Sequence, residues 1–462
     1  MTVTFVTAFI DLQEDRSKDK DVSTYIRQFE HLASSGICIH VFASEQYTHL
    51  LNHPNVHVEI LELNKTTTWA ETQGIEYRLP TTRTNYHDTA PFLILMNAKT
   101  EFVKRAIDAD VFKSTQYAWI DFGIFHMIRD AGAAVRRLAC IGQCTFLPGV
   151  WIPGCWDACA PCFDYVHWRF CGSFFVGDRA SILEFTSRMR SRFQTILQEG
   201  VLTWEVNVWA RLESEGWAPR WFKSDHNDAI LAIPGSAYSV VASLTTIPPR
   251  ESECRATIDS LLHQVDHVYL AISSNYRRFG EYSPPEYLKQ EPYASKVTVC
   301  IGEDYGPASK YIGSTPPDDT WVFVCDDDQE YAPNIIDRMR SSVTQVAIYQ
   351  NHYASIKEKT SGGMVHGYVG NLVHSSVLKG LRSFPLPDCA RFVDDQWVSM
   401  YCQLNAIPVL PTDVETYAEI FKVTQNGHEK LGTHSLSGLG TRADRVQELE
   451  HFFGVSFLDK RA

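Results

Sequence analysis

Three consecutive aspartates, Asp326, Asp327 and Asp328, follow the apolar run at 321–325. A short run of Val and Phe bounded by polar residues predicts a buried strand, so these carboxylates would lie where that strand leaves a sheet. Carboxylates this close together repel one another unless a positive charge lies between them. Hard oxygen ligands in loose geometry favour Mg²⁺ or Mn²⁺ carrying a phosphate. The triplet therefore predicts a metal–phosphate site, and the alternative is a solvated acidic turn, since Asp is common in turns.

Two segments between residue 244 and the triplet carry groups that suit a nucleotide. The segment 245–250 follows an apolar run, and the Arg250 guanidinium could bind a phosphate or a base edge. In the segment 304–310, a Gly-Pro bend would let the backbone approach a ligand, and Lys310 is placed to neutralise a diphosphate. The alternatives are a proline-rich strand exit with a solvated arginine and an ordinary surface turn.

Two adjacent acids, Asp394 and Asp395, open a helical stretch that follows the glycine-dense segment 363–370. A carboxylate held in a pocket can act as a general base that deprotonates an acceptor hydroxyl. The alternative is a structural one, because Asp often begins a helix and gains from the helix dipole there.

These segments, in the order T-I-P-x-R, D-Y-G-P-A-x-K, D-D-D, a glycine-rich segment and D-D-x-W, resemble a family of GT-A glycosyltransferases. That family occurs in bacterial polysaccharide clusters and in large DNA viruses, including chloroviruses. The resemblance spans 238 to the C-terminus. It implies that Asp326 and Asp328 hold Mn²⁺ or Mg²⁺ with the donor diphosphate, and that Asp395 is the base of an inverting displacement.

The same resemblance implies further site residues. Asp394 would lie beside the base, and the nucleotide sugar would contact Thr245, Arg250, Asp304, Lys310 and Asp327. Many GT-A enzymes add a late histidine as a metal ligand, and His428 and His434 are both candidates. The implied partners are a nucleotide-diphosphate sugar of UDP or GDP type and a glycan acceptor.

The first half of the chain resembles the HtrL/YibB-like family, whose members occur in bacterial surface-polysaccharide gene clusters and are similar to GT-A glycosyltransferases. The resemblance is carried by the segments 4–11, 97–99, 119–123, 171–177, 204–207 and 224–228. It implies a second GT-A domain, in which Thr7 and Lys99 contact the nucleotide sugar.

The candidate site of the first half is less complete. Asp121 supplies one carboxylate where a full D-x-D supplies two, and a metal could be held by Asp121, His226 and the substrate's phosphates. Glu205 is the candidate catalytic or acceptor-orienting carboxylate, flanked by Trp204 and Trp209, whose flat faces suit sugar rings. The alternatives are a helix-surface glutamate beside two core tryptophans, and a catalytically silent duplicate domain.

Strand-like and helix-like segments alternate in both halves, which predicts an α/β fold with two mostly parallel sheets, helices on both faces and ligands at the carboxyl ends of strands. Strands are predicted at 3–9, 37–42, 117–121, 238–244, 268–272 and 321–325, and helices at 178–198 and from about 97 to 107. Turn residues at 233–237 place the boundary, which gives tandem GT-A domains at 1–233 and 234–462.

The length, net charge, apolar runs and cysteines of the chain make some classes of protein more plausible than others. A chain of 462 residues is expected to form two domains, and a net charge of −13 argues against a nucleic-acid partner. The apolar N-terminus lacks the marks of a signal peptide, and no apolar run approaches the length of a membrane span. These features predict a cytoplasmic protein, in the host cytoplasm if the source is viral. The 12 cysteines are expected to be free thiols, because the cluster from 140 to 171 lacks clean zinc-ligand spacing.

The leading hypothesis is a bifunctional sugar transferase. Its rivals are a single active transferase in the second half beside an inert first half, a metal-dependent nucleotidyl- or phosphotransferase, and a carbohydrate-binding scaffold.

Overall fold

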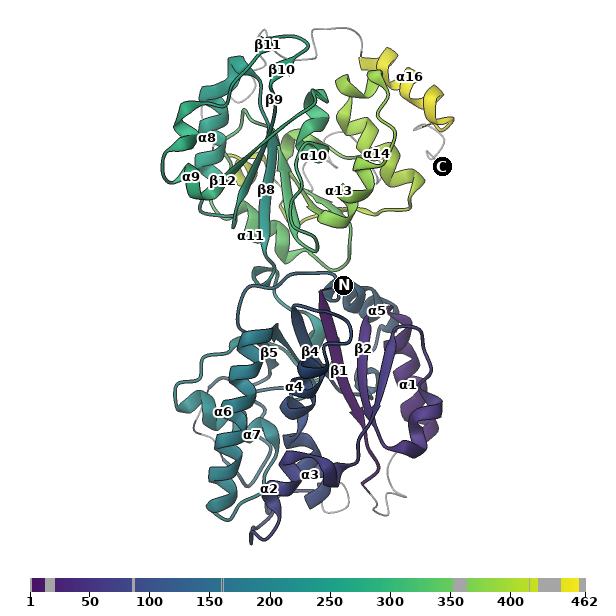
Figure 1. The fold of residues 1–462 in the computed structure, drawn as a ribbon, viewed down its shortest axis with the longest axis vertical. Coiled ribbons are helices and arrows are strands. Elements are labelled where there is room, and N and C mark those ends of the chain that lie inside the picture. The colour runs from purple at the N-terminus through teal and green to yellow at the C-terminus, as the bar shows by residue number, and fades with distance from the viewer. Residues whose placement is uncertain are drawn as a thin grey trace. The chain divides into compact units, whose positions relative to one another are not determined.

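The computed structural model describes residues 2–12, 21–84, 88–158, 160, 162–351, 364–414, 416–422 and 442–456. The chain divides into two compact units, 1–237 and 238–462, here called the first and second domains. The division follows the turn at 233–237 that the sequence marks as a boundary. Both domains are drawn in Figure 1.

The first domain contains a seven-stranded sheet in the order β3-β2-β1-β4-β6-β5-β7. The strands are β1 (Val3–Phe9), β2 (Cys38–Ala43), β3 (Val56–Ile60), β4 (Gln116–Ile120), β5 (Val150–Gly154), β6 (Phe174–Asp178) and β7 (Arg220–Lys223). Every pairing is parallel except those of β6, which runs antiparallel to β4 and β5.

The second domain repeats this sheet strand for strand, in the order β12-β9-β8-β13-β15-β14-β16. The strands are β8 (Val240–Thr245), β9 (Val268–Ser273), β12 (Val297–Gly302), β13 (Trp321–Cys325), β14 (Ile348–Gln350), β15 (Asn371–His374) and β16 (Val409–Pro411). Here β15 is the antiparallel strand, in the place that β6 takes in the first domain. A separate hairpin pairs β10 (Asn275–Tyr276) with β11 (Gly280–Glu281). The predicted α/β class with two mostly parallel sheets is confirmed.

Helices flank each sheet (Figure 1). Those of the first domain are α1 (Val22–Ser34), α2 (Thr67–Thr72), α3 (Ala90–Asn97), α4 (Lys99–Ala109), α5 (Ala131–Ile141), α6 (Arg179–Gln198) and α7 (Glu205–Ser214). Those of the second are α8 (Glu251–Leu261), α9 (Tyr293–Lys296), α10 (Ser309–Ile312), α11 (Ile335–Ser341), α13 (Ser375–Arg382), α14 (Asp394–Leu404), α15 (Tyr417–Ile420) and α16 (Arg442–Phe453). Among the residues described, no helix is long and apolar enough to cross a membrane.

The sequence explains where α6 and α4 begin. Asp178 caps α6, because its Oδ1 accepts a hydrogen bond from the Ser181 N–H at 2.9 Å, and the helix predicted at 178–198 is confirmed. The helix predicted from about 97 instead begins at Lys99, because α3 ends at Asn97 and the chain turns at Ala98. This break places Lys99 at the start of α4, where its side chain reaches the sheet edge.

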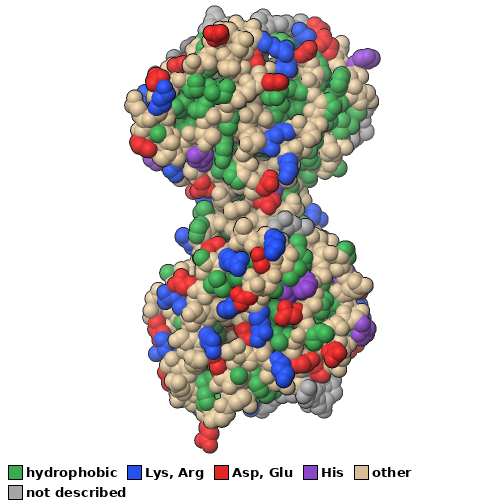
Figure 2. Space-filling model, viewed as in Figure 1, with side chains coloured by type: hydrophobic (Ala, Val, Ile, Leu, Met, Phe, Trp, Pro, Cys, Tyr) green, Lys and Arg blue, Asp and Glu red, His purple; other side chains and the backbone are tan. Residues whose placement is uncertain are grey.

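Alternating strand residues build a core on each face of the first sheet. Val6 and Trp119 pack with Phe102 of α4 in the larger core. On the other side, Phe29 of α1 stacks on Phe122 with ring centroids 4.6 Å apart. At the surface, Lys and Arg side chains are interspersed with Asp and Glu on the face that Figure 2 shows.

Two glycines with positive φ allow a matched test of packing in the second domain. Gly370 (φ +80°) leads into β15, and a Cβ there would lie 2.3 Å from Phe323 Cζ, whereas Gly280 (φ +76°) has no atom within 4 Å of that position. We expect Gly280→Ala to lower the free energy of unfolding by about 1–2 kcal/mol, for backbone strain alone. Gly370→Ala should cost about 2–3 kcal/mol more, because of the clash. Equal losses in urea denaturation would contradict this packing.

Candidate active sites

A buried lysine joins two acidic side chains at the carboxyl edge of the second sheet. Lys310 lies in α10, and only 3% of its side chain is exposed. Its Nζ lies 2.6 Å from Oδ1 of Asp326, the residue that follows β13, and 2.9 Å from Oδ2 of Asp394, the first residue of α14. The lysine thus holds together a strand end and a helix start that lie far apart in the chain.

The charges in this cluster depend on one another. Burial lowers the pKa of Lys310, but the charges of Asp326 and Asp394 outweigh it and hold the pKa well above its usual value. A buried charge without partners is costly, and the two carboxylates supply the opposite charge that the buried lysine needs. The sequence placed Lys310 on a diphosphate, and in this structure its ammonium is shared by two carboxylates.

Asp395 has the surroundings of a proton acceptor. Its Oδ1 accepts a hydrogen bond from the Gly367 N–H at 2.8 Å. Burial and the charge of Asp394 raise the pKa of Asp395 to about 7, against the opposing effect of Lys310. A carboxylate with a pKa near neutrality is well suited to general base catalysis.

Neither acid occupies the N-cap position of α14, although both lie in its first turn, where the helix dipole favours negative charge. Val393 occupies the N-cap position of α14, and no side chain caps the helix there. Asp395 bonds instead to Gly367, where a Cβ would lie 2.6 Å from Asp395 Oδ1 and 2.7 Å from Lys310 Nζ. The close approach explains why this position of the glycine-dense segment carries no side chain.

The three consecutive aspartates differ in burial: Asp327 is buried, whereas Asp326 and Asp328 are partly exposed. Asp327 is 4% exposed and accepts hydrogen bonds from Thr246 Oγ1 at 2.6 Å and from Arg250 at 2.9 Å. Burial raises the pKa of Asp327 to about 6, although Arg250 opposes the shift. The alternative of a solvated acidic turn is therefore wrong, and Asp327 anchors the loop after β8. Thr246 was not among the predicted site residues, although it lies in the same segment.

Asp326 and Asp328 keep partial exposure, 30% and 16% of their side chains. Burial and the charge of Asp326 raise the pKa of Asp328, so the two carboxylates lie close enough to repel. Two such oxygens fit Mn²⁺ or Mg²⁺. Among the residues described, no third His, Cys or acidic ligand completes a cluster with them, so substrate and water would supply the remaining ligands. His428 and His434 lie outside the described residues.

Thr245 and Asp304 support the loops around this site. Thr245 Oγ1 donates to the Ala271 carbonyl oxygen at 2.7 Å, on the neighbouring strand β9. The Asp304 carboxylate accepts from the backbone N–H groups of Arg277 and Gly306, each at 2.9 Å. Both side chains fix the backbone of segments that the sequence assigned to the nucleotide.

The first domain contains the same kind of cluster. Lys99 Nζ lies 2.8 Å from Glu205 Oε1 and 3.1 Å from Asp121 Oδ1, and it donates to the Gly172 carbonyl oxygen at 2.9 Å. Its side chain is 2% exposed. Burial lowers the pKa of Lys99, but the charges of Asp121 and Glu205 outweigh it and the net shift is upward.

The two clusters occupy equivalent places in the two sheets. Asp121 follows β4 as Asp326 follows β13, and Glu205 opens α7 as Asp394 opens α14. A glycine ahead of the antiparallel strand closes each cluster, since a Cβ at Gly172 would lie 2.1 Å from Glu205 Oε1. The sequence named the lysines and the acids separately, and the structure joins them.

Two expectations for the first domain are corrected. Glu205 is not a helix-surface glutamate, because only 6% of its side chain is exposed. Trp204 and Trp209 are 6% and 0% exposed, so their faces serve the core and not a sugar ring. Thr7 is also fully buried, and its hydroxyl has no hydrogen-bond partner within the described part of the chain.

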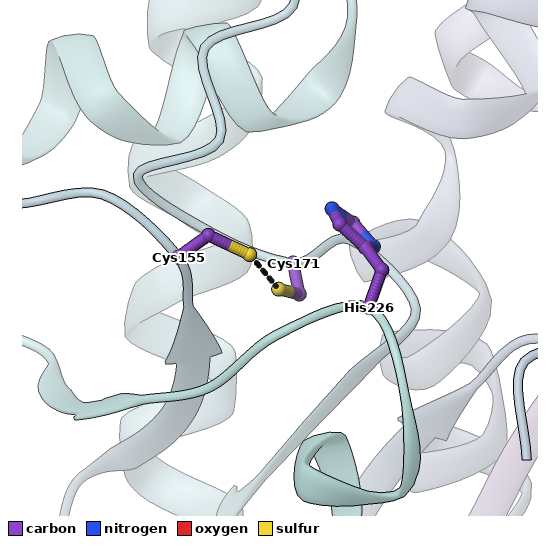
Figure 3. Close-up of side chains that lie close together, drawn as sticks. All are labelled: Cys155, Cys171 and His226. Carbon is purple, nitrogen blue, oxygen red and sulfur yellow. Dashed lines mark hydrogen bonds between the residues drawn. The ribbon is translucent and has the colours of Figure 1, made fainter.

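The structure gives Asp121 and His226 further neighbours. Asp121 Oδ1 receives the Trp119 Nε1–H at 2.8 Å and lies 3.1 Å from Lys99 Nζ. His226 groups with Cys155 and Cys171, as Figure 3 shows. The metal site of Asp121, His226 and the substrate's phosphates stays a prediction.

No family model matches this chain, and no curated protein matches it. The fold and the two lysine–carboxylate clusters define an α/β protein with two acidic sites at the carboxyl edges of its sheets. In open α/β sheets, this edge is where ligands bind.

Replacing Lys99 with methionine tests how much the buried cluster contributes. We expect Lys99→Met to lower the free energy of unfolding of the first domain by about 3–5 kcal/mol, because the buried Glu205 and the partly exposed Asp121 lose their counter-charge. Lys104→Met, in the same helix, removes an exposed pair with Asp108 and should cost at most about 0.5 kcal/mol. Similar losses for both variants in chemical denaturation would show that the buried cluster does not stabilise the domain.

Proposed function

We propose that this protein is a bifunctional glycosyltransferase with tandem GT-A domains, which moves sugars from nucleotide-diphosphate donors to a glycan acceptor. The resemblances of the two halves favour this chemistry over other uses of an acidic strand end. The second domain would be metal-dependent and inverting. The placement of Asp395 carries the proposal: it is a partly buried carboxylate with a pKa of about 7, beside the lysine that pairs with Asp326.

In the second domain, Asp395 would take the proton of the acceptor hydroxyl as its oxygen attacks the anomeric carbon of the donor sugar. The bond from that carbon to the diphosphate breaks, and the electron pair leaves with the nucleoside diphosphate. Asp326 and Asp328 would hold Mn²⁺ or Mg²⁺, which when bound neutralises charge on the donor diphosphate. Lys310 supplies a positive charge between Asp326 and Asp394, and Gly367 orients Asp395.

In the first domain, Glu205 would be the acid–base or acceptor-orienting group, held by Lys99. The ammonium of Lys99 lies where a cation is needed beside Asp121. The alternative remains a first domain that binds glycan without catalysis.

The pH dependence of transfer tests the role of Asp395. Because the base must be ionised, we expect kcat/KM of the second domain to fall about tenfold per pH unit below pH 7. Asp395→Asn keeps an oxygen acceptor for Gly367 but removes the base, so the rate should fall by about 10² or more. Asp388→Asn, at an acid whose side chain is 86% exposed, is the control and should match the parent.

Stability gives a second readout for the same variant. The folded-state pKa of Asp395 is raised, so the favourable contribution of this group to stability is present below its ordinary pKa and is lost as pH rises through about 7. Asp395→Asn, which is always neutral, should therefore be more stable than the parent above pH 7. A variant that loses stability but keeps its rate would show that Asp395 is structural.

Product analysis tests the two-site proposal. Asp121→Asn should remove one sugar addition and Asp328→Asn the other, because their clusters belong to separate domains. Excess EDTA should stop the addition that depends on Asp328. Mass spectrometry of the products distinguishes the outcomes: if Asp121→Asn gives the parent's product, only the second domain is catalytic. Release of pyrophosphate from a nucleoside triphosphate, without sugar transfer, would indicate a nucleotidyltransferase.

A further inference from the structure

Three side chains that can bind a transition metal meet at one edge of the first sheet. Cys155 follows β5, Cys171 precedes β6 and His226 follows β7. In the sheet, β5 lies between β6 and β7, parallel to β7 and antiparallel to β6, so all three residues lie at the same edge. Figure 3 shows the two sulfur atoms facing each other with the imidazole beside them.

The spacing of the ligand atoms fits a tetrahedral ion. The two Sγ atoms lie 3.4 Å apart, and one nitrogen of His226 lies within 4.8 Å of both. Zinc–sulfur bonds of about 2.3 Å in a tetrahedral site hold two sulfurs roughly 3.8 Å apart. A disulfide would need about 2.0 Å. Among the described cysteines, all are free.

The backbone holds these ligands in place without the ion. The Cys155 N–H donates to the Trp168 carbonyl at 3.0 Å, and the Cys171 N–H donates to the Pro153 carbonyl at 2.7 Å. The edge of the Trp168 ring contacts the His226 ring, with centroids 4.1 Å apart. A site of this kind is preorganised, which reduces the entropy cost of binding.

We propose that Cys155, Cys171 and His226 bind one Zn²⁺ ion, with water or a substrate group in the fourth position. Two thiolates and an imidazole favour zinc over Mn²⁺ or Mg²⁺, which prefer oxygen ligands. The site thus differs in chemistry from the carboxylate pair of the second domain. It escapes notice in the sequence because its ligands, at 155, 171 and 226, are spread over three strand ends.

The ion would also position the acidic cluster of the first domain. Cys171 directly precedes Gly172, whose carbonyl oxygen accepts from Lys99 and whose Cα packs against Glu205. An ion that fixes Cys171 therefore fixes the chain on which the Lys99–Glu205 contact depends. The role is one of positioning, since none of the three ligands bonds to Lys99, Asp121 or Glu205 in the described contacts.

Zinc content of the full chain tests the site. Tag-free protein is stripped with a chelator under reducing conditions, incubated with Zn²⁺ and desalted, and its metal is measured by mass spectrometry. We expect about one zinc per chain in the parent. Cys155→Ser and His226→Ala should lose it, and the exposed position of His226 makes that variant a safe test of binding apart from folding. Cys140→Ser is the matched control, because Cys140 and Cys144 form a second thiol pair at 3.7 Å with no third ligand in the described residues.

Two further measurements complete the test. With Co²⁺ as the probe, the parent and Cys140→Ser should show thiolate-to-metal charge-transfer absorption, and His226→Ala should not. Zinc should raise the melting temperature of the parent but not of His226→Ala. The proposal is overturned if the stripped parent takes up no zinc, if His226→Ala retains it, or if peptide mapping of the parent finds a Cys155–Cys171 disulfide. None of these readouts requires sugar transfer.

Discussion

An ammonium group buried between two carboxylates is the interaction on which each domain depends. Lys99 and Lys310 each connect a strand end, a helix start and a glycine-containing loop, three segments that are remote in sequence. Removing water from a charge costs several kcal/mol, and only close partners repay it. The sheet must therefore place its carboxyl edge, and the helix its first turn, to within hydrogen-bond distance of the lysine. The cluster therefore forms only in the correctly folded domain, and it helps to stabilise that fold.

The two domains share a buried lysine between two carboxylates at the sheet edge, and they differ in the side chains that surround this cluster. The second domain adds the exposed Asp328 beside Asp326 and the raised-pKa Asp395 beside Asp394, a set suited to a hard cation and a base. The first domain offers a single strand-end carboxylate, and it adds sulfur and imidazole ligands at the same edge. Under the proposed function, a shared cluster with different surrounding side chains fits two different transfer steps better than one step performed twice.

Much of the fold could be predicted from the sequence, because strands and helices leave local signals. The runs at 3–9 and 321–325 are strands with those bounds, and the helix predicted at 178–198 matches α6 with Asp178 as its N-cap residue. The order of the two sheets, including the reversed β6 and β15, had no local signal, because pairing across a sheet is decided by tertiary packing.

The residues of the two candidate sites could be identified from the sequence, but the contacts between them could not. Asp326, Asp395, Lys99 and Glu205 were all identified, yet Lys310 was assigned to a diphosphate and Lys99 to the nucleotide sugar, because charge alone does not reveal which counter-charge is closest. The grouping of His226 with Cys155 and Cys171 could not be predicted from the sequence, since these residues are far apart in the chain. Burial explains the remaining errors: Trp204, Trp209 and Thr7 have the chemistry of a binding site but lie in the interior.

The most direct measurement of the central claim is the release of free nucleoside diphosphate from a panel of UDP- and GDP-sugars, with Mn²⁺ present and no acceptor added. Glycosyltransferases hydrolyse their own donor slowly with water as acceptor, so the parent should release the diphosphate from a small subset of the panel. Lys310→Met, which breaks the second cluster, should abolish release from the donor used there. No release from any donor, or release that is unchanged in both Lys99→Met and Lys310→Met, would contradict the assignment of sugar transfer to these two clusters.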